Sequence, residues 1–165
     1  MTSRLARLGA IVLCASLASH AVAYDDIAPA EIADQFVAAL QHHRFKDAAA
    51  LFAPEAARDT AATARALKRI DDNVGGFSTM HPATTPLSGR TIRLEVPARN
   101  NVPFNVQKSV QARYASTAND GTPVFYEVHL TADSKPQVLS FALHVPAADA
   151  QSTRRAERLV SGINR

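Results

Sequence analysis

The histidines and acids of this chain could bind a metal or move protons, but their spacing does not match a metal site. His42 and His43 are adjacent, so on a helix they point about 100° apart and cannot form the i, i+4 pair of a metal clamp. His129 and His144 fall on separate rungs of the predicted sheet, and no cysteine or cluster of acids completes a set of three or four ligands. We therefore expect no metal site and no cofactor.

Turn residues and alternating apolar positions predict the pairing of the strands that carry Tyr114 and Tyr126. If residues 119–121 (Asn-Asp-Gly) form the first turn, Tyr114 lies opposite Tyr126. If residues 132–135 form the second turn, Tyr126 lies opposite Phe141. Both hairpins then share one apolar face. The other predicted pairs are Ala112 with Val128, Val110 with Leu130, Val128 with Leu139 and Val124 with Leu143.

The apolar face of these strands suggests a pocket wall formed by Tyr114, Tyr126 and Phe141. An aromatic row at strand spacing more often fills a core, and that is the interpretation we favour. The face carries no acid or histidine that could act as a general base, so we assign no catalytic residue. Three side chains could reach it from outside the sheet, namely Asp71, Asp72 and His81.

The opposite face of the same strands is less polar than a fully solvated sheet requires. The predicted register places Arg113 beside Glu127 and Glu127 beside Ser140, and it places His129 between Gln111 and Val138. Apolar residues such as Phe125 interrupt this polar pattern, which suggests a homodimer interface. The residues assigned to that face are Arg113, Phe125, Glu127, His129 and Ala142.

A period near 3.6 before residue 77 and near 2 after it predicts helices first and strands later. The first helix runs from Pro29 to about residue 42, and the second spans 45–53, where Pro54 stops it. The third ends at Gly75 and Gly76. A further strand is predicted over residues 91–96, and residues 97–108 form an irregular connection from it to the first hairpin. A short helix is predicted after Pro146. Its apolar stripe is Ala156, Leu159, Val160 and Ile163.

Helices followed by an antiparallel meander predict an α+β fold, with N-terminal helices packed on a curved sheet and a short C-terminal helix. Four segments carry a family resemblance, namely "RFKDAAALF", "LKRIDDNVGGF", "VFYEVHL" and "VLSFALHV". In these segments and in element order the chain resembles the nuclear transport factor two-like superfamily, also called the cystatin-like α+β cone, and its small exported members. The resemblance implies a bent sheet closing on the helices around a conical pocket. It also implies that the outer sheet face is a common site of dimerisation.

The N-terminus has the composition of a secretory signal peptide covering residues 1–23. Arg4 and Arg7 precede an apolar run of about 11 residues, which is shorter than the roughly 20 that span a membrane. Small residues then end at Ala23, with Ala21 as a second possible cleavage point. Lipidation of Cys14 is disfavoured by the large residue before it. We expect a periplasmic or secreted protein without a transmembrane segment, with residues 24–165 forming one domain.

Composition narrows the classes of partner. Cleavage removes two basic residues and no acid, which leaves 16 basic against 15 acidic residues and argues against nucleic-acid binding. Cys14 leaves with the leader, so the mature chain forms no disulfide. We expect a non-catalytic module that binds a small apolar ligand or an envelope protein. The alternative is an isomerase or hydrolase that uses the cone pocket, with Tyr114 or Tyr126 as hydrogen-bond donor and a base that the sequence does not name.

Overall fold

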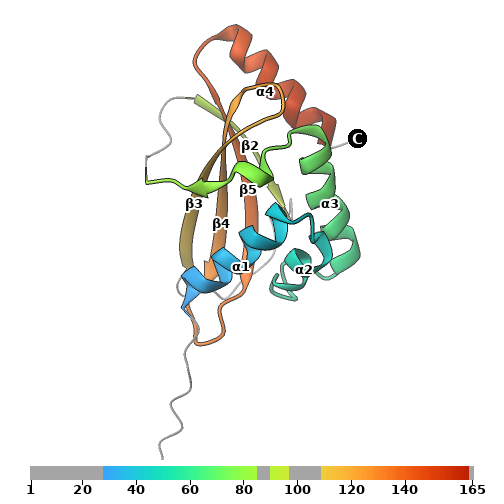
Figure 1. The fold of residues 1–165 in the computed structure, drawn as a ribbon, viewed down its shortest axis with the longest axis vertical. Coiled ribbons are helices and arrows are strands. Elements are labelled where there is room, and N and C mark those ends of the chain that lie inside the picture. The colour runs from blue at the N-terminus through green and yellow to red at the C-terminus, as the bar shows by residue number, and fades with distance from the viewer. Residues whose placement is uncertain (1–27, 85–89, 97–108, 164–165) are drawn as a thin grey trace, which may run out of the picture.

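The chain folds as helices, then an antiparallel sheet, then a final helix, in a computed structural model that describes residues 28–84, 90–96 and 109–163. Figure 1 shows this α+β architecture, with helix α1 (Pro29–Gln41) in front of the lower part of the strands, α2 (Phe45–Ala50) beside it and α4 (Ala150–Ile163) at the top. The described strands form one open, curved sheet and do not close into a barrel. The predicted fold class is confirmed. The signal peptide, Cys14 and the 97–108 connection lie outside the described residues.

The three predicted N-terminal helices are present, and their ends follow from local capping. Helix α1 (Pro29–Gln41) begins at a proline, whose fixed φ suits the first turn, and ends with His43 in the left-handed region. Helix α3 (Thr60–Asn73) begins where the Asp59 carboxylate accepts a hydrogen bond from the Ala62 N–H at 2.9 Å, and glycines follow its end. A short 3-10 helix, η1 (Phe77–Thr79), leads into the sheet.

The second helix is shorter than predicted, because its last residues pair with the sheet instead. Helix α2 covers Phe45–Ala50 and not residues 45–53. The Ala53 N–H donates to the Val138 carbonyl at 2.8 Å, and the Val138 N–H donates to the Leu51 carbonyl at 2.9 Å. These two bonds replace the final helical turn, and Phe52 turns into the core.

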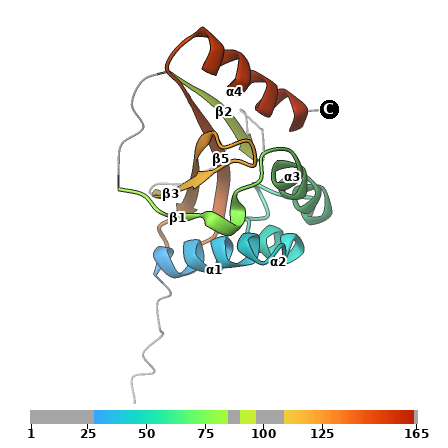
Figure 2. The same cartoon turned by 45° about the horizontal axis from the view of Figure 1, so that its top comes forward.

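Among the described residues, five strands form the sheet in the order β1-β3-β4-β5-β2, with every pair antiparallel. Their order in the sheet differs from their order in the chain, because β2 lies at the far edge beside β5, as Figure 2 shows. Helix α4 (Ala150–Ile163) follows β5 directly. The strand bounds are His81–Pro82 for β1, Arg90–Val96 for β2, Ser109–Thr117 for β3, Pro123–Thr131 for β4 and Val138–Ala147 for β5.

The register predicted for the first hairpin is confirmed. Tyr114 pairs with Tyr126, and the predicted Ala112–Val128 and Val110–Leu130 pairs are also present. The turn works because Gly121 adopts a φ of +83° and its N–H donates to the Ala118 carbonyl at 2.9 Å.

The register predicted for the second hairpin is wrong by two residues. Tyr126 lies opposite Leu143 and Glu127 opposite Ala142, not opposite Phe141 and Ser140. The loop closes one residue later than predicted, with the Thr131 N–H on the Gln137 carbonyl at 3.0 Å, and a bulge after His129 adds a second residue. Each shift of one residue reverses the face on which a side chain lies, and two such shifts restore it. Residues 140–145 therefore lie on their predicted faces. Val138 precedes the bulge and lies on the face opposite to the predicted one: it pairs with Leu130 and is buried in the core. Ser140 takes the place predicted for Val138, opposite His129.

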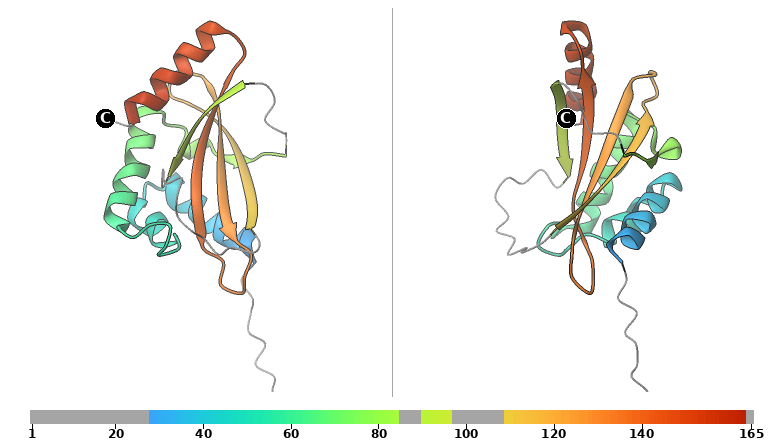
Figure 3. Two further views of the ribbon diagram at one scale, coloured as in Figure 1. Left: turned by 180° about the vertical axis from the view of Figure 1, so that it is seen from behind. Right: turned by 90° about the vertical axis from the view of Figure 1, so that its left-hand side faces the viewer.

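The core lies between the N-terminal helices and the concave face of the sheet, as the right-hand view of Figure 3 shows. Interlocking aromatic rings fill it, with the Phe36 ring 5.7 Å from that of Phe52 and 5.3 Å from that of Phe141. Helix α4 packs its predicted apolar stripe against β5, β2 and α3, and Ala156 and Ile163 are buried there. No helix in the described part of the chain is long and apolar enough to cross a membrane.

Candidate functional site

The side chains predicted to form a pocket wall are enclosed in the aromatic core. Tyr126 and Phe141 are fully buried, and their rings stack with centroids 5.3 Å apart and an interplanar angle of 8°. The Tyr126 hydroxyl donates to the Gly75 carbonyl at 2.8 Å, so it already has an acceptor. Phe77 contacts both rings edge-on. Within the described residues, packing therefore occupies the space that these two side chains face.

Tyr114 is also buried, but it lies beside an acid on α1. Burial raises the pKa of Tyr114 to about 12, and the nearby carboxylate of Asp34 adds to this rise. Asp34 itself is exposed on the helix surface and lies outside the core. The pair therefore keeps Tyr114 protonated as a hydrogen-bond donor at the edge of the core.

The three side chains expected to reach the core from outside the sheet are each engaged elsewhere. Asp71 comes closest, since burial and then the Asp71 carboxylate raise the pKa of Tyr126, but it pairs with His43 Nδ1 at 2.8 Å. Asp72 pairs with Lys68 at 2.6 Å, and the His81 ring lies 3.1 Å from the Thr79 carbonyl.

The outer face of the sheet, on the side away from α1 and α2, carries the most unusual group of the described residues. Glu127 lies near the middle of β4 and is only 5% exposed, although it points away from the core. Its cross-strand neighbours are Arg113 on β3, as predicted, and Ala142 on β5, which is fully buried. A carboxylate withdrawn from water needs partners for both oxygens.

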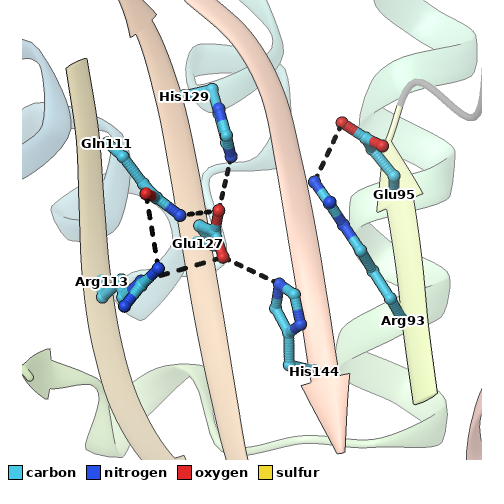
Figure 4. Close-up of polar contacts among 7 residues, drawn as sticks. All are labelled: Arg93, Glu95, Gln111, Arg113, Glu127, His129 and His144. Atoms are coloured by element: carbon cyan, nitrogen blue, oxygen red, sulfur yellow. Dashed lines mark hydrogen bonds and ion pairs between the residues drawn. The ribbon is translucent and has the colours of Figure 1, made fainter. Parts of the chain in front are cut away.

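Four side chains supply those partners (Figure 4), and we call Glu127 with these four the Glu127 cluster. Oε1 accepts a hydrogen bond from the Gln111 amide and lies 2.6 Å from His129 Nε2. Oε2 lies 2.9 Å from His144 Nε2 and 3.9 Å from Arg113 Nε. The cluster therefore joins β3, β4 and β5 through a single carboxylate.

His144 is the member of the Glu127 cluster whose buried ring nitrogens make no hydrogen bond within the described residues. Its Nε2 is at ion-pair distance from Glu127 but not aligned for a hydrogen bond, and its buried Nδ1 has no partner in the described part of the chain. Burial lowers the pKa of His144, and the positive charges of Arg93 and Arg113 lower it further, while the Glu127 carboxylate opposes them. His144 is therefore held neutral beside the carboxylate.

The exposed rim of the face is formed by charged side chains from the flanking strands. Arg93 and Glu95 on β2 pair at 3.3 Å, and their side chains are 42% and 37% exposed. Arg113 is 36% exposed, whereas the Glu127 side chain is 6% exposed. Phe125, one rung away on β4, is partly exposed on this same face. The predicted interface residues thus share one face, with Ala142 at its buried centre.

The cluster does not form a metal site in this arrangement. Among the described residues, no three His, Cys, Asp or Glu side chains have a geometry that could hold an ion. Both Glu127 oxygens are taken, and Arg113 places a positive charge beside them. The arrangement suits a fixed polar surface in which hydrogen bonds and ion pairs hold the side chains in place.

The structure also has an open groove beside α4, with a volume of about 540 Å³. Arg155 lines this groove and pairs with Asp120, with Nε 2.7 Å from Oδ2. Partial burial of Asp120 opposes its ionisation, but hydrogen bonds from Arg155 and Thr122 outweigh that effect and lower its pKa to about 2. This contact ties α4 to the β3–β4 turn, so we assign it a structural role.

The sequence missed the meeting of His129 and His144, and the register error explains why. The two histidines do lie on separate rungs, as predicted, opposite Ser140 and Phe125. The predicted register would have set His144 two positions further along β4, out of reach of Glu127. The observed register makes it a diagonal neighbour, which long side chains can span. The pairing of β2 with β5, which brings in Arg93 and Glu95, had no signal in the sequence beyond alternation.

Comparison with known proteins returns no match among family models, curated proteins or solved structures.

Proposed function

We propose that the protein is an exported, non-catalytic binding module that takes another protein chain on the outer face of its sheet. One observation carries the proposal, namely the buried Glu127 carboxylate on the face that the N-terminal helices leave free. Export through the N-terminal signal and membership of the nuclear transport factor two-like superfamily are part of the same proposal. The helix-then-sheet order and the curved sheet support that membership.

The chemistry of the face supports binding over simple solubility. Burying a carboxylate costs several kcal/mol unless its partners are well placed. A sheet face that only contacts water could carry exposed charges and avoid this cost. Here the centre of the face is withdrawn from water at Glu127, Ala142 and His144, while charged side chains surround it. A low-exposure centre with a charged rim is the usual anatomy of a protein interface.

The outer face fits a protein occupant better than the core fits a small apolar ligand. The rings of Tyr126, Phe141 and Phe77 contact one another where the ligand would sit. The occupant of the outer face is a second copy of this chain or an envelope protein. Partly exposed Phe125 supplies an apolar contact for either one.

Site-specific photo-crosslinking in the periplasm tests the proposal. We expect a crosslinker at Phe125 to form a protein adduct, and one at exposed Lys46 on α2 to form none. An adduct of twice the chain mass identifies a homodimer, and sedimentation of the purified protein should then show a dimer that Arg113→Glu dissociates. A monomer that forms no adduct from Phe125 would refute the proposed function.

A catalytic role is the second candidate, supported by the Asp34 carboxylate beside Tyr114. In an isomerase or hydrolase of this kind, Tyr114 would donate a hydrogen bond to a substrate oxygen at the edge of the cone. The test is turnover of model esters and enolisable ketones by the wild type and by Tyr114→Phe. Equal background rates for both proteins would exclude this use of Tyr114.

A further inference from the structure

Charge on the outer face is unevenly exposed. Glu127 and Glu95 formally balance Arg113 and Arg93, so the face is neutral while its histidines are neutral. The Glu127 carboxylate is buried, however, while both guanidinium groups and Glu95 reach solvent. An approaching partner therefore meets two positive groups and one negative group.

Proton uptake by the Glu127 cluster would add to this positive surface. The His129 side chain is 29% exposed and its Nε2 lies 2.6 Å from Glu127, so a proton on this ring would lie between the carboxylate and the solvent. The His144 side chain is 9% exposed, and the positive charges of Arg93 and Arg113 act against its protonation. The remaining neighbour, Gln111, is uncharged. A single added charge at His129 is the change that the geometry favours.

We propose that the outer face docks an acidic segment of a partner protein, and that protonation of His129 in mildly acidic conditions strengthens this docking. The inference rests on the proposed function and specifies its partner and its regulation. The occupant is acidic because the exposed charges of the face are mainly cationic. The docking depends on pH because the buried Glu127 carboxylate holds the partly exposed His129 imidazole at hydrogen-bond distance.

Binding of a fluorescein-labelled octa-aspartate peptide at low salt tests the inference. Aspartate stays ionised from pH 7.5 to 5.5, so any change in affinity comes from the protein. We expect the wild type to bind about two- to five-fold more tightly at pH 5.5, which is the effect of one surface charge. Added salt should weaken this binding.

Two substitutions at one position separate charge from structure. His129→Gln should bind equally at both pH values, and His129→Lys should bind at pH 7.5 as tightly as the wild type does at pH 5.5. His42→Gln is the matched control, because His42 is exposed at the end of α1, outside the cluster. It should keep the wild-type pH dependence.

The outcomes distinguish this inference from the proposed function. A His129→Gln protein that keeps the pH dependence, or a His42→Gln protein that loses it, would overturn the role of His129. Absence of peptide binding by a wild type that crosslinks through Phe125 would overturn the acidic partner and leave the outer face as an interface. A wild type that neither binds the peptide nor crosslinks would overturn both.

Discussion

Replacing Glu127 by glutamine should destabilise the protein more than any other conservative carboxylate substitution on the outer face. Glu127→Gln keeps the shape of the side chain but removes the charge that His129, Gln111 and Arg113 surround. One hydrogen bond to a charged group contributes about 1.5–3 kcal/mol, and breaking a buried ion pair costs about 3–5 kcal/mol. Arg113 is 36% exposed and can turn to water, so we expect a loss of about 2–3 kcal/mol.

Urea unfolding of the mature protein, followed by circular dichroism, measures this loss. The midpoint should fall without a change in the slope m, and the melting temperature should fall by about 6–12 °C for a domain of this size. Glu95→Gln is the matched control, because that carboxylate lies on the same face but is 37% exposed, and it should cost less than about 1 kcal/mol. A Glu127→Gln protein within about 0.5 kcal/mol of the wild type, or a Glu95→Gln protein equally destabilised, would refute the reasoning.

Two further predictions concern pH and backbone geometry. Because burial lowers the pKa of His144, the unfolded chain binds a proton below about pH 6.5 that the folded state resists, so stability should decrease as the pH falls. His144→Gln should flatten that decrease in urea melts from pH 7.5 to 5, and an unchanged slope would contradict the role of burial. Gly76→Ala should lower the melting temperature more than Gly121→Ala does. Both residues have positive φ, and alanine in that backbone conformation alone costs about 1–3 kcal/mol of stability. Only at Gly76 would the new Cβ also lie 2.6 Å from the Thr117 carbonyl oxygen. Equal losses would show that the contact with Thr117 relaxes freely.

Local signals located most of the helices and strands correctly. Proline at the start of α1 and glycines after α3 marked helix ends, because these residues act through their own backbone geometry. The first hairpin was predicted in the correct register, because its turn residues and its apolar alternation agree. The end of α2 was not predicted, because Leu51 and Ala53 bond to a strand more than 80 residues away.

The candidate site was predicted only in part. Alternation alone placed Arg113, Phe125, Glu127, His129 and Ala142 on one face, and the observed register keeps them on one face. It did not place His144 beside Glu127, because a bulge after His129 has no counterpart in the residue pattern. The burial of Glu127 was also unpredicted, because it depends on side chains that arrive from neighbouring strands.

The sequence by itself determined the order of the longer helices and strands, most of their faces and one hairpin, since these depend on spacing and on turn chemistry within short stretches of chain. The tertiary structure decided that β2 lies beside β5, that rings of Phe36, Phe77 and Phe141 fill the core, and that two histidines converge on Glu127. These features depend on contacts between residues far apart in the chain. A shift of two residues preserves every alternating pattern while changing which side chains meet, so only the folded arrangement fixes the chemistry of the outer face.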